Sequence, residues 1–550
     1  MKSKNSKLKL YLITLLIALM GFGSLALTRS NIFQQIVFSQ RLMNNVYKYL
    51  ITNYVDDINI EKFTGTSIRN MVNEMDPYTI YMEADEREGL ELLTSGKYGG
   101  VGIQIGEREG RLTVIAPMDD TPAQRAGIIS GDVIIKIDDK PTKDMNLDEA
   151  AKMIRGLKGT KVKLTIERFG EDDPLEFTLE RDDIRVKDVA YAGMLNDNVG
   201  YIRLTRFSKN SGPEMKEALK KIINRGAGSV ILDLRDNPGG LLNSAIEILD
   251  MFIPRGKLLL STRGRTRESN RTFYSSKRPI VPADMKVAVL INGGSASASE
   301  IVAGTLQDMD RAVIIGNTSF GKGLVQTVFG LDEKRSLKIT TAKYYIPSGR
   351  LIQKPGYIDQ DLILSHQEKD SVFTTVGGRL VKGGGGIIPD HEVSTKKVPP
   401  LTRECWRQGA FFSFAQKHRF DYPSLSAVKN DNQLLDKFRV YLQDINLDVN
   451  LAGEKQYEEA KSKLLSMDST NIDLRTAFQN IESFIANRES SLFDEEKDWL
   501  ELSLLQEFAS IYEGNEGRFK VSLSKDNVVN TAIDILQNQV AYREIFSVHN

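Results

Sequence analysis

The sequence predicts a multidomain α/β protein, in which a β-rich module precedes an α/β core and mainly helical regions flank the two. Its 550 residues correspond to about three or four domains. Apolar residues make up 41% of the chain and charged residues 27%, as in ordinary globular proteins. Strand-like and helix-like segments alternate between residues 199 and 393, and this alternation indicates a sheet covered by helices.

Changes in pattern along the chain suggest four domain boundaries. The predicted regions are a signal peptide or membrane anchor (1–28), a helical N-terminal region (29–96), a β-rich module (97–184), an α/β core (185–395) and a mainly helical extension of unknown role (396–550). In the second region, apolar residues recur at helical spacing, and the proline at position 77 ends that pattern.

Charge and cysteine content exclude several classes of function. The 73 basic and 73 acidic residues give a formal net charge of zero, which offers no electrostatic footprint for nucleic acid. The single cysteine, Cys405, cannot form an intramolecular disulfide, and we expect it to be a small buried apolar residue. The four histidines do not have metal-ligand spacing, so we expect no zinc site and no cofactor.

The N-terminus carries the clearest compositional anomaly. Four lysines precede an uncharged run at residues 10–28. Basic residues before an apolar segment orient it with the basic end in the cytoplasm, so we expect the body to be exported to the periplasm or cell envelope. The run is long for a signal peptide and just long enough to span a bilayer, which slightly favours a retained anchor over cleavage after the small residues at 24–26. A buried core helix is the remaining alternative.

A serine-rich turn is the sharpest local feature of the core. The segment Asn-Gly-Gly-Ser-Ala-Ser-Ala-Ser-Glu at 292–300 follows an apolar strand at 287–291 and precedes a helix-like run at 301–306. A tight turn between a strand and a helix can expose a nucleophile above a sheet, and amides at the helix start can stabilise an oxyanion. Helix capping is the commoner use of serine at such a place, so this segment alone does not establish catalysis.

A glycine-flanked lysine provides a candidate base. Lys322 lies in Ser-Phe-Gly-Lys-Gly-Leu-Val-Gln at 319–326, after an apolar strand at 312–315. Desolvation favours the neutral amine, which can accept a proton, and Gln326 can hydrogen-bond to that amine and orient it. Ser-Lys catalysis needs no histidine, whereas a Ser-His-Asp triad requires late segments to fold back, because every histidine follows Lys322: His366, His391, His418 and His549.

A third turn contains candidate oxyanion donors. The segment Asp-Leu-Arg-Asp-Asn-Pro-Gly-Gly at 233–240 ends an apolar strand and opens a helix. Paired glycines allow a ligand to approach the backbone closely. The amides of Gly239 or Gly240, together with that of Ala298, can donate to a tetrahedral oxyanion. An ordinary strand-to-helix turn is the alternative interpretation.

Together these segments resemble the carboxy-terminal processing, or tail-specific, protease family. The resemblance covers about residues 46–393 and includes further motifs at 75–81, 345–350 and 386–390. It implies a crotonase/ClpP-like α/β protease core, a fold shared with enoyl-CoA hydratase-like enzymes, so that fold alone does not prove protease chemistry. The segment at 355–382 is longer than the usual family link, and the extension at 396–550 lies beyond the common catalytic core.

The resemblance also assigns roles to individual residues. It implies that Ser297 is the nucleophile, Lys322 the base and Gln326 its supporting residue, with Ala298 and one of the two glycines as oxyanion donors. Ser295 and Ser299 are rival nucleophiles within the same turn, and only the family alignment rejects them.

The β-rich module resembles a PDZ domain, through its segments at 100–103, 121–128 and 131–134. The resemblance implies that a substrate tail adds as a strand and that its carboxylate binds to backbone amides. The predicted peptide-binding residues are Gly100, Val101, Gly102, Ile103 and Ile105. Their apolar pocket, with the helix at 147–154 as its other wall, predicts a preference for apolar terminal residues.

One arginine has two interpretations. Arg155 lies at the end of the predicted helix of the PDZ-like module. In some relatives an arginine at this place couples the PDZ position to the active site. A cation that favours a helix C-terminus through the macrodipole explains it equally well.

These expectations describe a serine endopeptidase that binds the C-termini of exported or envelope proteins and cleaves them with a Ser297–Lys322 dyad. The expected partners are protein substrates with free C-termini, the membrane through the N-terminal segment, and a second copy of the chain or a regulatory adaptor. The alternatives are a catalytically silent PDZ scaffold and a crotonase-like acyl-CoA enzyme.

Overall fold

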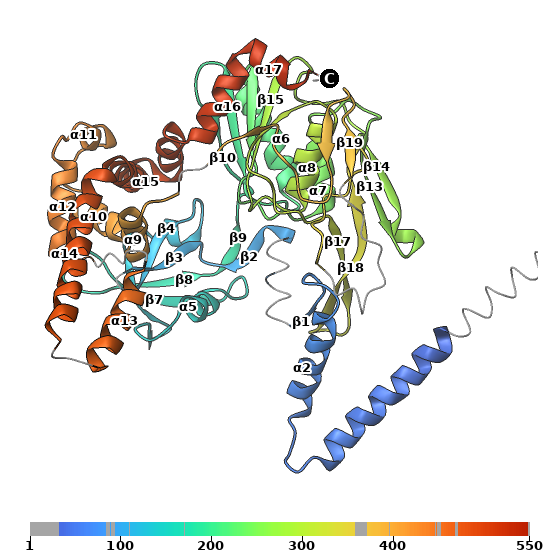
Figure 1. Ribbon diagram of the computed structural model, residues 1–550, viewed down its shortest axis with the longest axis horizontal. Coiled ribbons are helices and arrows are strands. Elements are labelled where there is room, and N and C mark those ends of the chain that lie inside the picture. The colour runs from blue at the N-terminus through green and yellow to red at the C-terminus, as the bar shows by residue number, and fades with distance from the viewer. Residues whose placement is uncertain are drawn as a thin grey trace, which may run out of the picture. The chain divides into compact units, whose positions relative to one another are not determined.

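The computed structural model describes most of the chain (Figure 1), namely residues 32–83, 89, 94–108, 110–169, 171–357, 371–394, 397–445, 447, 453–467 and 471–547. The chain divides into two compact units, and the boundary between them falls at Tyr81 and Met82. No helix in the described ranges is long and apolar enough to cross a membrane. The uncharged run at 10–28 lies outside these ranges.

The N-terminal unit is helical, as predicted. A helix covers residues 32–53, and α2 (Ile60–Asn73) follows it after a short connection. Asn59 caps α2 by accepting a hydrogen bond from the amide of Lys62 at 3.0 Å. The Tyr47 hydroxyl lies 2.8 Å from Thr64 Oγ1, which ties the first helix to the second.

The β-rich module forms an antiparallel sheet with one eight-residue helix and one single-turn helix. Its sheet has the order β3-β4-β5-β7-β8, and β2 pairs separately with β9 where the chain enters and leaves the module. The elements are β2 (Lys97–Gly100), β3 (Ile103–Arg108), β4 (Arg111–Pro117), α4 (Pro122–Arg125), β5 (Val133–Ile137), β6 (Lys140–Pro141), α5 (Leu147–Ile154), β7 (Lys161–Glu167), β8 (Leu175–Glu180) and β9 (Asp182–Arg185).

A mostly parallel sheet lies at the centre of the α/β core. Its order is β10-β11-β12-β15-β16-β21, and only β10 runs antiparallel to its neighbour. Its strands are β10 (Val189–Met194), β11 (Val199–Leu204), β12 (Ser229–Asp233), β15 (Lys286–Ile291), β16 (Val313–Gly316) and β21 (His391–Glu392). The inner strands are continuous apolar runs because both faces of the sheet are covered.

Helices cover both faces of this sheet (Figure 1). On one face, an apolar core joins the strands to α6 (Ser211–Asn224), α7 (Leu242–Leu249) and α8 (Ala298–Asp308). On the other face, a second core joins them to α16 (Asn527–Gln537), with α17 (Gln539–Ile545) at its margin. Helix α8 begins at Ala298, three residues before the run that we expected to be helical, so Ser299 and Glu300 belong to its first turn.

A second, antiparallel sheet packs beside α8. It includes β13 (Leu258–Gly264), β14 (Arg271–Tyr274), β17 (Leu324–Gly330) and β18 (Ser336–Tyr345). Strands β19 (Val372–Thr374) and β20 (Leu380–Lys382) form a small separate hairpin. The candidate base Lys322 lies just before β17, so the start of this sheet determines its backbone position.

The C-terminal extension contributes to two different cores. The region from α9 to α15 builds its own apolar core, in which Cys405 is fully buried, as predicted. The helices of this region are α9 (Pro400–Gln408), α10 (Ala410–His418), α11 (Leu425–Lys429), α12 (Leu434–Asp444), α13 (Glu454–Met467), α14 (Ile472–Glu495) and α15 (Lys497–Ser524). Helices α16 and α17 return to the central sheet instead.

Candidate active site

Ser297 occupies a sharp turn between β15 and α8. It is the residue that precedes the first turn of α8, with φ 54° and ψ −112°. A positive φ is rare outside glycine, and such strained backbone persists where the surrounding structure enforces it, often at active sites. The side chain is partly exposed, so this turn presents a hydroxyl at the carboxyl end of the parallel strands.

The two rival serines have structural contacts. Ser295 and Ser299 are both fully buried. The Ser295 hydroxyl donates to the carbonyl of Leu234 at 2.8 Å, and the Ser299 hydroxyl donates to the carbonyl of Asn237 at 2.8 Å. Both therefore hold the serine turn against the 233–240 turn, and Ser297 is the partly exposed member of the three.

A buried carboxylate joins the segments of the two candidate catalytic residues. Glu300 Oε2 accepts the amides of Ser297 and Lys322, each at 2.8 Å. Its Oε1 accepts the amide of Gly321 at 2.7 Å and the hydroxyl of Ser319 at 2.5 Å. Burial raises the pKa of Glu300, and these hydrogen bonds oppose the rise. Glu300 is not among the site residues predicted from the sequence, although an acid three residues after a helix-capping serine is a recognisable capping pattern.

A tyrosine makes the second link between these segments. Tyr344 of β18 is almost fully buried, and its hydroxyl lies within hydrogen-bond distance of the carbonyls of Ser297 and Lys322. The Ser297 contact is 3.1 Å. Amides on one side and carbonyls on the other therefore fix both backbones, so the structure brings the two predicted residues together at the backbone level.

The glycines around Lys322 are required by close packing. A side chain at Gly323 would place its Cβ 2.8 Å from the amide nitrogen of Gln353, and Gly321 has φ 89°. The Gly323 amide donates to Gln353 Oε1 at 2.8 Å. Lys322 itself is partly buried, and the Gln326 amide group donates to Thr340 Oγ1 at 3.4 Å.

The predicted oxyanion turn packs directly on the serine turn. A Cβ on Gly239 would lie 2.9 Å from Ser297 Cβ and 2.8 Å from the amide of Ala298. The Gly239 amide donates to Asn237 Oδ1 at 2.9 Å. Gly240 forms an isolated bridge with Phe207, and a Cβ on it would lie 2.2 Å from the Phe207 carbonyl. Only glycine fits at either position.

A charged cluster fixes the start of this turn. Asp233 is fully buried, and its carboxylate contacts Arg203, Arg235 and the Tyr201 hydroxyl. Burial alone would raise the pKa of Asp233, but the two arginines lower it to about 2. Arg235 also pairs with Asp526, which caps α16, at 2.8 Å. Nothing in the sequence indicates this link, because the two residues are far apart in the chain.

The described histidines have other places in the fold. His391 lies on β21, and His418 on α10 makes a 2.6 Å contact through Nδ1 with Asp421. His366 and His549 lie outside the described residues. In the described part of the chain, no group of three or more His, Cys, Asp or Glu side chains could hold a metal ion.

The PDZ-like module contains an open groove of about 530 Å³ between β3 and α5. Four predicted peptide-binding residues line it, namely Val101, Gly102, Ile103 and Ile105, while Gly100 lies just before them at the end of β2. Arg155, the residue that ends α5, also lines the groove, and its guanidinium lies 5.2 Å from the centre of the Tyr98 ring.

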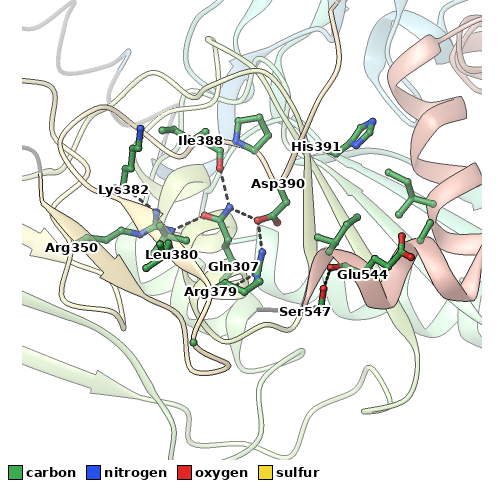
Figure 2. A pocket seen from close by; sticks show the side chains of 16 residues that line it. Gln307, Arg350, Arg379, Leu380, Lys382, Ile388, Asp390, His391, Glu544 and Ser547 are labelled. Atoms are coloured by element: carbon green, nitrogen blue, oxygen red, sulfur yellow. Dashed lines mark hydrogen bonds and ion pairs between the residues drawn. The ribbon is translucent and has the colours of Figure 1, made fainter. Parts of the chain in front are cut away.

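Figure 2 shows another cavity, of about 820 Å³, at the far end of α8. Charged and polar side chains that line it form hydrogen bonds and ion pairs with one another. Arg379 pairs with Asp390, and the Gln307 amide group donates to the same carboxylate at 2.9 Å. Arg350 donates to Gln307 Oε1 at 2.7 Å. Neither Ser297 nor Lys322 lines this cavity, so it is separate from the candidate active site.

Comparison with known proteins identifies the family. Residues 198–364 match the family model of peptidase family S41, and residues 113–168 match that of a PDZ domain. A carboxy-terminal-processing protease of Bartonella bacilliformis is 41% identical over 324 residues, which cover 58% of this chain and 74% of that protein. The chain belongs to the carboxy-terminal processing protease family.

Two further sequence matches agree with this membership. Residues 401–536 match the C-terminal helical domain of probable PDZ-proteases. A probable CtpA-like serine protease of Staphylococcus epidermidis is 30% identical over 470 residues, which cover 82% of this chain and 88% of that protein. Among solved structures, the photosystem II D1 C-terminal processing protease is 25% identical, with a TM-score of 0.35, covering 64% of this chain and 86% of that chain.

These findings confirm the predicted family, the α/β peptidase core with a PDZ domain and a helical C-terminal region, and the serine-type peptidase class. They leave a crotonase-like acyl-CoA enzyme without support. The individual catalytic and peptide-binding residues, and the domain boundaries given above, stay predictions.

Proposed function

We propose that this serine-type peptidase captures the C-terminal tails of exported or envelope proteins in its PDZ groove and cleaves them with Ser297 as nucleophile and Lys322 as base. The observation that carries the proposal is the shared acceptor Glu300, which binds the amides of both residues. Two segments held at one carboxylate oxygen bring a strained serine and a glycine-flanked lysine into one neighbourhood.

The chemistry requires a neutral lysine. Lys322 Nζ accepts the Ser297 hydroxyl proton as Oγ attacks the scissile carbonyl, and then donates it to the leaving amine. Lys322 next deprotonates a water molecule that hydrolyses the acyl-enzyme. Lys322 is partly buried and flanked by glycines that fix its backbone, and Gln326 is the proposed group that orients its amine.

For the oxyanion, we favour Gly240 over Gly239. The Gly239 amide donates to Asn237 Oδ1, so it is already engaged. The Gly240 and Ala298 amides are the remaining proposed donors. Ala298 begins α8, where amides lack partners within the helix and the macrodipole favours negative charge.

Tail capture is supported by the groove between β3 and α5. Ile103, Ile105 and Ile154 give it apolar walls, which suit an apolar terminal residue. A tail that adds beside β3 would gain backbone hydrogen bonds, while the loop at 101–102 offers amides for its carboxylate. Export rests on the lysine-rich N-terminus and the uncharged run at 10–28.

Cleavage of a disordered protein substrate tests the proposal. The purified chain should cut the substrate, whereas the Ser297→Ala and Lys322→Ala variants should bind it uncut. Identical fragments from all three proteins would overturn the proposed dyad. Binding without cleavage by the unmodified chain, given substrates with varied C-termini, would instead favour the silent scaffold.

A further inference from the structure

The PDZ groove is completed by two residues from outside the module. Val186 and Arg206 line the same cavity as β3 and α5. Arg206 follows β11 in the peptidase core, beyond the residues 113–168 that match a PDZ domain. A tail in this groove would therefore touch the peptidase core itself.

Among the described residues, the Arg206 side chain has one polar contact, a long ion pair. It is 21% exposed, and its Nε lies 3.4 Å from Asp188 Oδ1 as an ion pair. Asp188 is fully buried, and its other oxygen accepts the Ser208 hydroxyl at 2.5 Å and the Ser208 amide at 3.2 Å. Within the described residues, Asp188 Oδ1 has no hydrogen-bond partner. The guanidinium, with five N–H donors, thus retains donors for a ligand.

The backbone that carries Arg206 is firmly anchored. Phe207 is fully buried, and its amide donates to the Gly239 carbonyl at 3.0 Å. Its carbonyl accepts the Leu241 amide at 2.7 Å. The backbone of Arg206 therefore has a fixed position beside the groove, which lowers the entropy cost of using this residue in recognition.

Arginines outnumber carboxylates on the walls of the groove, although the buried carboxylate of Asp188 pairs with one of them. Two arginines and one carboxylate, that of Asp148, line it. Arg155 stacks on Tyr98, whereas Arg206 faces the groove beside a single buried acid. A planar guanidinium matches a carboxylate in a bidentate geometry, which adds specificity as well as affinity.

We propose that Arg206 is a specificity-determining residue that binds a carboxylate of the captured tail. That carboxylate is either the terminal carboxylate or an acidic side chain close to the end. The inference rests on the proposed tail capture and deepens it, because it makes the peptidase core part of the recognition site.

Fluorescence anisotropy with the full-length Ser297→Ala chain tests this inference. The probes are three decapeptides that end in valine and carry an uncharged BODIPY dye on the N-terminus: one with a free terminal carboxylate and no acidic side chain, one amidated, and one amidated with a glutamate two residues before the end. Adding Arg206→Ala should weaken binding of a carboxylate-bearing probe about 10-fold and leave the neutral amidated probe unchanged. The affected probe identifies which carboxylate is bound.

Three further variants separate recognition from folding. Arg206→Ala leaves the buried Asp188 charge unpaired, so the double variant Arg206→Ala/Asp188→Asn provides a form without that charge. Asp188→Asn alone should tighten binding of the same carboxylate probe, because it removes the competing acid. Arg111→Ala, which removes an exposed arginine of β4 that pairs with Glu167, is the matched control and should not alter binding.

The outcomes distinguish this inference from the proposed function. If no probe binds the Ser297→Ala parent, tail capture itself fails, and the inference fails with it. If Ile105→Glu abolishes binding while the double variant binds every probe like its parent, tail capture stands and Arg206 has no part in it. An equal loss for the neutral probe would also overturn the inference.

Discussion

The amides of Ser297 and Lys322 donate to the same oxygen atom, Oε2 of Glu300, each across 2.8 Å. Their carbonyls in turn lie within hydrogen-bond distance of one hydroxyl, that of Tyr344. The two segments are thus fixed from both sides by buried groups. These contacts fix the backbones of the proposed nucleophile and base relative to each other.

Replacing Glu300 by glutamine should reduce turnover more than substrate binding. Glutamine offers one acceptor oxygen where the carboxylate accepts four donors, so at least one buried amide loses its partner, at a cost of about 1–3 kcal/mol. We expect kcat to fall about 10- to 100-fold, because small displacements of reacting groups are costly. Steady-state kinetics should show little change in KM.

Glu496→Gln is the matched control for this substitution. Glu496 is also buried and accepts the amides of Leu401 and Thr402, but it lies in the C-terminal helical region. The Glu496→Gln substitution should lower the melting temperature and leave kcat unchanged. Equal losses of kcat in the two variants would contradict a specific function of Glu300.

The three serines of the turn should behave differently towards a fluorophosphonate probe. Ser297→Ala should abolish covalent labelling without loss of stability. Ser295→Ala and Ser299→Ala remove buried hydrogen bonds to Leu234 and Asn237, so each should cost about 1 kcal/mol of unfolding free energy and still be labelled. Labelling of Ser297→Ala, located by peptide mass spectrometry at either neighbour, would refute the assignment.

Lys322→Arg should be inactive although it preserves the positive charge. A guanidinium remains protonated at any accessible pH, so it cannot act as a general base. Lys354→Arg is the control. Lys354 is exposed and lies beside the same glycine-rich segment, since its amide donates to the Gly321 carbonyl at 3.0 Å. Hydrolysis of a disordered substrate should persist in the control alone. Substantial activity of Lys322→Arg would exclude lysine as the base.

Local patterns in the sequence predicted the elements that carry the candidate site. The serine turn and the Phe-Gly-Lys-Gly turn each follow a continuous apolar strand, and such strands between covering helices are recognisable without tertiary information. The PDZ residues came instead from the resemblance to a PDZ domain, and the groove between β3 and α5 is lined by four of them: Val101, Gly102, Ile103 and Ile105.

Contacts between distant segments could not be predicted in this way. Tyr344 lies on a strand of the second sheet, and nothing around it in sequence indicates that its hydroxyl lies beside Ser297. Arg206 reads as an ordinary charged residue after β11, yet the fold places it in the groove of a module that precedes it. The residues of the serine turn alone could not separate Ser297 from its neighbours; the family resemblance made that choice, and the burial of Ser295 and Ser299 supports it.

Asp233 should make a measurable contribution to acid stability. Its pKa is about 2 in the folded protein, against about 3.8 for an unpaired aspartate, because Arg235 and Arg203 outweigh the effect of burial. The lowered pKa stabilises the fold above about pH 4, and this stability is lost as the pH falls towards 2. The difference corresponds to about 2 kcal/mol. Denaturant titrations at several pH values should show that the unfolding free energy of Asp233→Asn is lower overall and falls less steeply between about pH 4 and 2 than that of the unmodified chain. An equally steep fall in the two proteins would contradict this prediction.

Helix α16 should support catalysis through Asp526. This residue caps the helix by accepting the amides of Val528 and Val529, and it also pairs with Arg235 at the start of the turn that packs on Ser297. Asp526→Asn keeps a good capping side chain but removes the charge, so we expect kcat to fall a few-fold with little change in melting temperature. Asp526→Ala should show the same kinetic loss and a further cost of about 1 kcal/mol in stability.

The control for this pair is Asn538→Ala, which removes the corresponding cap of α17 from the amides of Val540 and Ala541. It should lower stability without a kinetic effect, because Asn538 makes no contact with Arg235. If Asp526→Asn retains full kcat, the ion pair with Arg235 only fastens α16 to the sheet. If Asn538→Ala lowers kcat as much as Asp526→Ala does, general loosening of the C-terminal helices explains both, and the specific link from Asp526 through Arg235 to the active-site turn is refuted.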